Sequence, residues 1–217
     1  DIYQQNKKNK EAVGVYESIV AQNPDNEQYL YVLGMLYKEN KEYDKAIETF
    51  NRLQNKVGMI DMLSVEKQQL YMLLGKNRQA VNELQQYINK YPQDARGYSF
   101  MGDLYLQLND LTKAGQYYQI AIDKDDPGSV FNFSLGNVSI LKGDTSTFKS
   151  LYSIGLKSNM ITSDIKINKI IPLLMDRDFS DKSKPLIASF IDDLKATHPE
   201  DGETNSFLAR YYSSIDD

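Results

Sequence analysis

Few side chains in this sequence could carry out chemistry. It contains one histidine, His198, and no cysteine in its 217 residues. Without a thiol there is no thiolate nucleophile, and a single imidazole does not supply a zinc site built from several histidines. His198 stands beside Pro199 at a predicted helix end, where a cationic side chain is mildly favoured, so we expect a surface residue there. We therefore predict no catalytic residues and no bound cofactor.

Two acidic clusters are candidates for metal ligands. One occupies Asp123–Asp126 and the other Asp176–Asp181. A calcium loop needs a bidentate Glu at its twelfth position, which is Ser134 for the first cluster, and the second cluster also lacks the central glycine. Residues Gly75–Asn77 lack the upstream glycine of a phosphate-binding loop. The sequence predicts solvated turns here rather than metal or nucleotide sites.

The composition argues against further classes of partner. The net charge is −5 and the sequence pI is about 5.0. A nucleic-acid binder needs a basic face that neutralises phosphates, so this balance argues against one. The chain has no run of roughly 18 apolar residues, the length that a membrane-spanning helix requires. We predict a folded chain with no nucleic-acid partner and no transmembrane segment.

The elements that must position the side chains repeat along the chain. Four tyrosines follow one another at intervals of 34 residues: Tyr3, Tyr37, Tyr71 and Tyr105. Four alanines do the same: Ala12, Ala46, Ala80 and Ala114. Three glycines share another phase, with Gln68 in the gap: Gly34, Gly102 and Gly136. Inside each unit, spacings of three, four and seven place the apolar residues on one helical face, which predicts pairs of amphipathic helices.

The recurring residue types are those expected where two helices of a pair meet. Glycine in mid-helix costs roughly 0.5–1 kcal/mol against alanine, a cost that is tolerated where helices approach closely. Alanine allows the same approach on the partner helix, and aromatic rings fill the remaining space. The predicted packing positions are Leu30, Gly34, Tyr37, Ala46, Phe50, Tyr71, Ala80, Gly102, Tyr105, Ala114 and Gly136.

This pattern resembles the tetratricopeptide repeat, a helix–turn–helix unit of about 34 residues. The resemblance implies an all-α fold, a right-handed α-solenoid of stacked antiparallel helix pairs, as a single domain over residues 1–217. The expected units are 27–60, 61–94, 95–128, a degenerate unit at 129–162 and a degenerate unit with an insertion at 163–201. Partial units at 1–26 and 202–217 lead us to expect a piece of a longer array.

The pattern becomes irregular toward the end of the chain. We expect helices at about 129–142 and 145–158, followed by one over 163–175. Pro172 lies inside that third helix and should kink it or end it early. The polar segment Asp176–Lys182 is predicted to be a loop that carries the insertion, before a further helix capped by Ser183.

The same resemblance implies a partner-binding groove on the first helices of the units. The candidate contact residues are Tyr31, Met35, Val65, Gln69, Met72, Ser99, Asp103, Phe133 and Asn137. Exposed apolar groups in a concave surface usually mark partner binding, although packing against a neighbouring helix is an alternative role. The expected function is a non-enzymatic scaffold that binds a protein or extended peptide. The alternatives are a glycan-binding module on the same helices and a regulatory domain of a larger envelope protein.

Segments Gln54–Leu74 and Tyr91–Gly143 are also similar to long multi-repeat proteins of the Bacteroidetes cell envelope, which are often lipoproteins. Repeat phrases such as Asp103–Gln107 and Leu135–Asp144 carry this similarity. It implies a periplasmic or outer-membrane-associated location, with the cytoplasm as the alternative.

Overall fold

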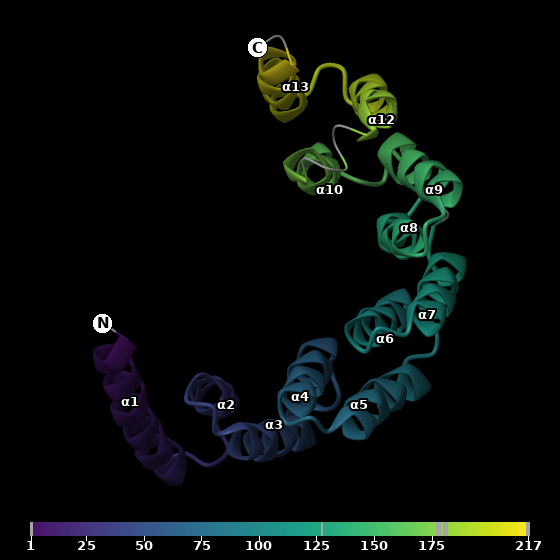
Figure 1. Ribbon diagram of the computed structural model, residues 1–217. Coiled ribbons are helices and arrows are strands. Elements are labelled where there is room, and N and C mark those ends of the chain that lie inside the picture. The colour runs from purple at the N-terminus through teal and green to yellow at the C-terminus, as the bar shows by residue number, and fades with distance from the viewer. Residues whose placement is uncertain (1, 127, 177–178, 180–181, 216–217) are drawn as a thin grey trace. The chain divides into compact units, whose positions relative to one another are not determined.

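The computed structural model describes residues 2–126, 128–176, 179 and 182–215, and every regular element assigned in these ranges is an α-helix (Figure 1). The all-helical fold class predicted from the repeat is therefore confirmed. The helices form two compact units, Asp1–Gln93 and Asp94–Asp217, and each is described by itself. We call them the N-terminal unit and the C-terminal unit.

The N-terminal unit is a row of helices in which each element packs against the next along the chain. They are α1 (Ile2–Gln22), α2 (Glu27–Glu39), α3 (Tyr43–Val57), α4 (Asp61–Leu73) and α5 (Asn77–Lys90). The core lies where the helices of successive pairs meet, and Leu30, Phe50, Leu63 and Leu70 are fully buried there. The buried apolar residues of α1 to α4 thus form one continuous cluster that extends beyond a single helix pair.

The C-terminal unit continues the same arrangement and has an aromatic core. Its helices are α6 (Ala95–Gln107), α7 (Leu111–Lys124), α8 (Phe131–Leu141), α9 (Thr145–Lys157), α10 (Ser163–Met175), α12 (Lys184–Thr197) and α13 (Gly202–Ile215). The rings of Phe148, Tyr152 and Phe190 pack against one another, with Tyr152 stacked on Phe190 at 5.3 Å between ring centroids. These rings join α9 to α12, whose sequence register the insertion had shifted.

The turn inside each helix pair depends on one residue in the left-handed conformation. These residues follow one another at intervals of 34: Lys41 (φ 62°), Gly75 (φ 68°), Asn109 (φ 59°) and Gly143 (φ 81°). Side chains other than glycine are uncommon in this region, although asparagine adopts it more readily than most. The same turn therefore reverses the chain direction in four successive helix pairs. Glycine fills the left-handed position in two of them, and lysine or asparagine fills it in the other two.

The mid-helix glycines lie under aromatic rings. A Cβ atom added at Gly34 would overlap the Phe50 ring, and one at Gly102 would come within 2.7 Å of Tyr118. Gly136 repeats the relation with Tyr152, at 2.8 Å. In each case the ring belongs to a residue sixteen positions further along the chain. Gln68 interrupts the glycine phase, and a smaller side chain, Leu84, stands at the aromatic position of that pair.

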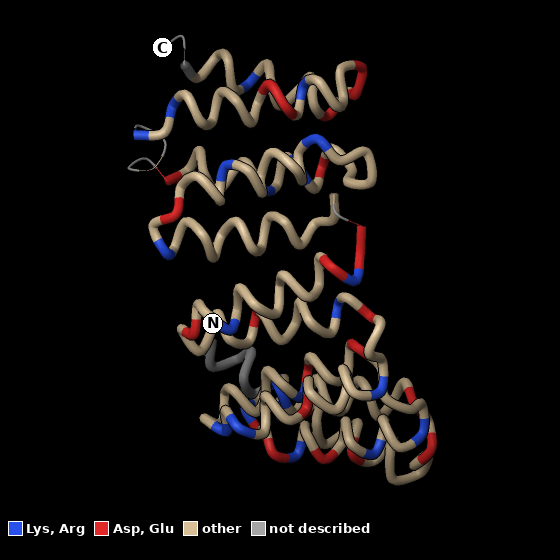
Figure 2. The backbone as a smooth tube through the Cα atoms, turned by 90° about the vertical axis from the view of Figure 1, so that its right-hand side faces the viewer, with Lys and Arg blue, Asp and Glu red and all other residues tan. Residues whose placement is uncertain are grey.

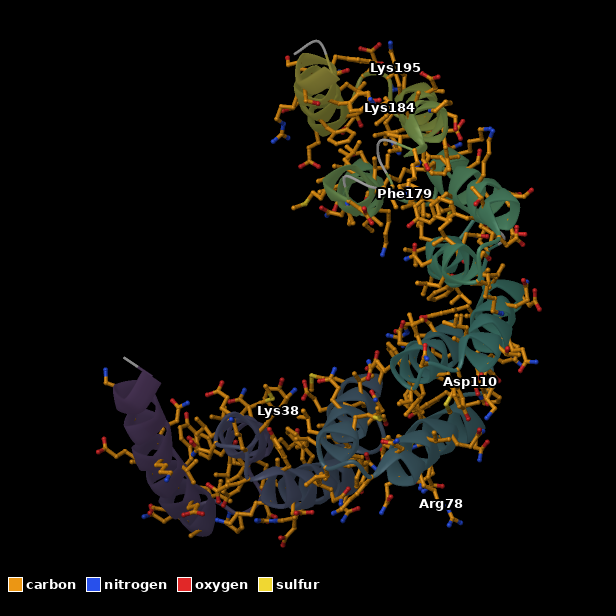
Figure 3. All side chains as sticks on the ribbon, viewed as in Figure 1. Lys38, Arg78, Asp110, Phe179, Lys184 and Lys195 are labelled. Carbon is orange, nitrogen blue, oxygen red and sulfur yellow. The ribbon has the colours of Figure 1, made fainter. Side chains whose placement is uncertain are left out.

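The insertion agrees with its predicted form in one respect and differs in another. Helix α10 runs over Ser163–Met175, as predicted, with Pro172 inside it. Four residues of the predicted loop, 177, 178, 180 and 181, lie outside the described residues. Phe179 lies within them, and its ring packs edge-on against Phe148 at 5.9 Å between centroids (Figure 3). The segment predicted to be polar therefore contributes a ring to the core of the C-terminal unit.

Candidate binding surface

The predicted groove residues of the N-terminal unit lie on α2 and α4. Tyr31 and Met35 pack partly against the buried core, and Gln69 is exposed. The Nζ atom of Lys38 reaches from α2 to α4, where it lies 2.6 Å from Glu66 Oε2 and 3.0 Å from Gln69 Oε1 (Figure 3). Both Lys38 and Glu66 are half-buried, so this contact holds the two helices together at the surface. Val65 and Met72 are half-buried on α4.

A hollow of about 480 Å³ opens between α2, α3 and α4 in this unit. We call it the α2–α4 hollow; its lining residues are Glu27, Gln28, Tyr31, Val32, Leu53, Val57, Ile60 and Met62. The Tyr31 ring forms one wall and is tilted against Phe50 at 6.2 Å. Ile60 and Met62 are 36% and 44% exposed, which is high for apolar side chains beside a core. Of the predicted groove residues, Tyr31 alone lines this hollow.

Glu27, in the first turn of α2, is the charged residue among those that line the α2–α4 hollow. Glu27 begins α2, and Asp61 begins α4, where its carboxylate accepts a hydrogen bond from the Met62 backbone at 2.8 Å. Lys56 forms a short ion pair with Asp25. The hydrogen bond that Lys56 donates to Asp25, together with the charge of Lys56, lowers the pKa of Asp25 below its ordinary value. The lining therefore includes one carboxylate, that of Glu27, and Lys56 is directed to Asp25.

The predicted groove residues of the C-terminal unit are engaged by the fold. Asp103 Oδ1 accepts a hydrogen bond from the Tyr118 hydroxyl at 2.5 Å, and Asn137 Oδ1 accepts one from Tyr152 at 2.6 Å. Both pairs occupy the same two positions, one repeat apart. Burial raises the pKa of Asp103, and the Tyr118 hydrogen bond offsets part of that rise. Ser99 is only 8% exposed, whereas Asp103 is exposed and Asn137 is half-buried beside these hydrogen bonds.

Phe133 is not on the surface at all. We predicted a partner contact there, but the side chain is fully buried, with its ring edge-on to Tyr152 at 5.0 Å. The reason lies on the opposite helix, where Gly155 leaves the space that the ring fills. A Cβ atom at Gly155 would come within 2.7 Å of the Phe133 ring. Phe133 therefore belongs to the core and is left out of the candidate surface.

A second hollow, of about 480 Å³, lies between α10 and α13 in the C-terminal unit. Its lining mixes Ile167 and Ile171 with charged and polar side chains that include Asp164, Glu203 and Arg210. We did not identify it from the sequence, because the pairing of these helices depends on the insertion between them. Its mixed lining gives no single chemical preference.

Lys166 and His198 form a contact that the sequence did not indicate. Lys166 is fully buried on α10, and its Nζ lies 2.9 Å from Nε2 of His198, at the end of α12. Burial lowers the pKa of Lys166 to about 8. We expected His198 to be a surface residue, whereas it is half-buried and is the side-chain partner of a buried lysine. The contact joins two helices, and neither residue is among those that line the two hollows.

The first acidic cluster forms local hydrogen bonds. Asp123 accepts one from Gln119 at 2.9 Å, and Asp126 accepts one from the Gly128 backbone at 2.7 Å. Across the described part of the chain, no three His, Asp or Glu side chains are grouped so that they could hold a metal ion. Asp178 and Asp181 of the second cluster lie outside that part. In the same ranges no helix has the length and apolar character needed to cross a bilayer. Figure 2 shows basic and acidic residues interspersed along the helices of both units.

Comparison with known proteins identifies the repeats. Two family models, both described as tetratricopeptide repeat, match residues 3–59 and 69–129, which together are more than half of the chain. Subunit 3 of the anaphase-promoting complex of Schizosaccharomyces pombe is 23% identical over 140 residues. That match covers 64% of this chain and 21% of the subunit, so the chain spans about a fifth of that relative's length.

Solved structures of bacterial repeat proteins share the fold. A tetratricopeptide-repeat protein of Thermus thermophilus has a TM-score of 0.53 at 17% identity, covering 88% of this chain and 99% of that one. PilF of Pseudomonas aeruginosa has a TM-score of 0.53 at 14% identity, with coverages of 96% and 92%. MamA of Desulfovibrio magneticus has a TM-score of 0.51 at 22% identity, with coverages of 70% and 88%. At these identities the likeness concerns the fold alone.

Proposed function

The chain belongs to the tetratricopeptide-repeat family, and on that premise we propose that it is a non-enzymatic scaffold that holds a protein or extended peptide against α2 and α4. Repeats of this family commonly serve as binding surfaces for proteins. The observation that carries the proposal is the α2–α4 hollow, with Tyr31 as a wall and Ile60 and Met62 partly exposed at its edge.

The physical argument is the removal of apolar surface from water. Each Å² of apolar surface that a partner covers contributes about 25 cal/mol, before the cost of ordering the partner is subtracted. Tyr31 is a suitable anchor, because Phe50 already restrains its ring. The Lys38–Glu66 contact links α2 to α4 before any partner arrives, so less ordering remains to be done on binding.

A glycan ligand is less well supported, because sugars stack on open aromatic faces. In the C-terminal unit the Tyr105 ring is stacked on Tyr117 at 5.5 Å, and the Lys113 ammonium lies 4.8 Å from its centre. Tyr117 and Lys113 therefore already contact the Tyr105 ring on which a sugar would have to stack. The aromatic wall of the α2–α4 hollow is a single tyrosine, which suits an apolar side chain better than a stacked sugar ring.

Site-specific photo-crosslinking tests the proposal. A photoreactive amino acid is placed at Met62, which is 44% exposed in the hollow, and in a second protein at Val15, which is 57% exposed on α1. In cells of the source organism, we expect a protein crosslink at Met62 that mass spectrometry maps to one segment of the partner. The crosslink should disappear when Tyr31→Ala is added.

Two results would contradict the scaffold proposal. One is the same set of crosslinks at Met62 and Val15, which would mean that contact is not specific to the hollow. The other is no crosslink at Met62 that depends on Tyr31. Circular dichroism of the Tyr31→Ala protein is the accompanying control, because an unfolded variant would lose the crosslink for another reason.

For location we propose the cell envelope, on the resemblance carried by Gln54–Leu74 and Tyr91–Gly143. Fractionation of source cells with an antibody to this chain tests that proposal. Recovery in the membrane or periplasmic fraction is the expected result, and recovery with cytoplasmic markers contradicts it.

A further inference from the structure

We propose that Lys166 and His198 form an acid-sensitive latch, which holds α10 against the end of α12 at neutral pH and releases it when the imidazole is protonated. The inference goes beyond the scaffold proposal, because it concerns how the C-terminal unit responds to pH and needs no partner. Two observations carry it. The side chain of Lys166 is fully buried, and the acceptor that its ammonium meets is an imidazole instead of a carboxylate.

A second buried lysine in the same chain shows why the imidazole matters. Lys67 is 3% exposed and meets the carboxylate of Glu83 at 2.9 Å. Carboxylates keep their charge through the neutral and mildly acidic range, so a pair of that kind persists across it. An imidazole accepts a hydrogen bond only while it is neutral, and its ordinary pKa is about 6.5. The Lys166 contact is therefore conditional on pH in a way that the Lys67 contact is not.

Protonation of His198 brings two positive charges together. Burial lowers the pKa of Lys166 to about 8, so the ammonium still carries its proton over the range in which an imidazole titrates. Nε2 of His198 then accepts the hydrogen bond, and its ring proton lies on Nδ1. After protonation both groups are donors, and like charges 2.9 Å apart repel one another strongly in a buried site. The contact between α10 and α12 is lost as a result.

The charged groups around the pair do not replace the missing carboxylate. Asp201 follows His198 closely, but the Thr204 backbone N–H and the Ser163 hydroxyl hold the pKa of Asp201 below its ordinary value. Asp201 is thus engaged at the start of α13, where it accepts the Thr204 hydrogen bond at 2.7 Å. It stays ionised in this pH range and favours the protonated form of His198. Further charged side chains on the adjoining segments are exposed: Asp164, Lys195, Glu200 and Glu203.

The latch controls α10 and leaves the neighbouring contact of α12 intact. Helix α10 packs against α12 and α13 (Figure 1), and the α10 residues Asp164 and Ile167 line the hollow between α10 and α13. On the other side of α12, Asp193 accepts a hydrogen bond from Ser153 of α9 at 2.6 Å and pairs with Lys157 at 3.3 Å. Neither contact includes an imidazole. Acidification should therefore loosen α10 and its hollow while α9 and α12 stay together.

Hydrogen exchange of the full chain, measured by mass spectrometry at pH 7.5 and pH 5.5, tests the latch. After correction for the intrinsic exchange rate, the protection of α10 should fall by up to about tenfold, because the imidazole passes from mostly neutral to mostly charged. His198→Gln keeps an acceptor that does not titrate, so its α10 protection should stay nearly constant. The NMR signal of His198, the only histidine in the chain, gives the pH interval of protonation, and the loss should follow it.

Two further variants complete the test. Lys166→Met removes the ammonium and leaves His198 in place, so the pH-dependent loss should vanish, and this variant serves alone if His198→Gln does not fold. Glu200→Gln is the matched control, because it removes an exposed charge beside the pair and should keep the wild-type response. An equal fall of α10 protection in the wild type and in Lys166→Met overturns the inference, since other groups then cause it. Constant protection of α10 in the wild type overturns it too, because the protonated imidazole is then accommodated.

Discussion

The ammonium group of Lys67 on α4 lies 2.9 Å from the carboxylate of Glu83 on α5, in the interior of the N-terminal unit. Their side chains are only 3% and 6% exposed. Asn51 on α3 accepts a hydrogen bond from the Lys67 ammonium, at 3.0 Å. Lysine at this position departs from the apolar pattern of the other units, and the departure is matched by polar partners on two neighbouring helices.

Breaking this pair should be costly. Glu83→Gln leaves the Lys67 ammonium buried without a counter-charge, so we expect a loss of about 3–5 kcal/mol in the free energy of unfolding. The double variant Lys67→Met, Glu83→Leu removes both charges and should lose much less. Urea unfolding of the single and double variants measures the coupling. Asp44→Asn, which breaks the exposed pair with Lys76, is the control and should change stability by less than about 1 kcal/mol.

The contact of Gly34 with Phe50 predicts a rescue. Gly34→Ala adds a Cβ atom that overlaps the ring, so we expect a loss of about 1–3 kcal/mol on thermal or urea unfolding. Adding Phe50→Leu should recover much of it, because the natural Gln68 and Leu84 pair follows that rule. Gly14→Ala is the control. A Cβ atom added at Gly14 would meet no neighbouring group within 4 Å, so this substitution should stabilise α1 by up to about 1 kcal/mol. A neutral Gly34→Ala would contradict the packing described for this pair.

The two tyrosine hydroxyls that cross a helix pair should differ in strength. Tyr118→Phe removes a hydrogen bond to the carboxylate of Asp103, for which we expect a loss of about 1.5–3 kcal/mol. Tyr152→Phe removes one to the neutral amide of Asn137, for which about 0.5–1.5 kcal/mol is expected. Urea unfolding at neutral pH measures both. Equal losses would show that the charge on Asp103 adds nothing to its bond.

Lys166 predicts a particular dependence of stability on pH. Its pKa is lowered from 10.5 to about 8 in the folded chain, so between these values the unfolded chain binds more protons. Stability contributed by this group therefore rises as the pH increases through that window. Burial raises the pKa of Tyr118 and Tyr152, which acts in the opposite direction near pH 10. The difference in the free energy of unfolding between the wild type and Lys166→Met isolates the contribution of the lysine. We expect the wild type to gain stability relative to the variant as the pH rises from about 8 to 10.5. A constant difference would contradict the lowered pKa.

Phe133 and Met62 should separate stability from binding. Phe133→Ala empties a fully buried site and should cost about 3–5 kcal/mol. Met62→Asp alters a side chain that is 44% exposed and should leave the melting temperature nearly unchanged while weakening capture of the crosslinked partner. Calorimetry and a binding titration measure the two effects. A large fall in the melting temperature of Met62→Asp would place that residue in the core instead.

The sequence by itself determined the helices and their pairing. Period and residue type placed α10 at Ser163–Met175 and predicted tight packing at the mid-helix glycines, because helical faces depend on spacing within about one repeat. Tyr31 could be selected for the candidate surface on the same ground. The α2–α4 hollow beside Tyr31 could not be predicted from the sequence, because it forms only where the end of α3 and the start of α4 meet α2.

Only the tertiary structure decided the role of residues whose partners lie on another helix. Phe133 is buried because Gly155 leaves room for it, and Lys166 is tolerated because His198 lies 2.9 Å away. Lys67 likewise depends on Glu83. The sequence pattern predicts which face of a helix a residue occupies. Whether that residue is buried, and whether its charge is paired, depends on the side chains that the opposing helix supplies. That supply is set by packing between elements that are distant in sequence, which is why these three roles became visible only in the folded chain.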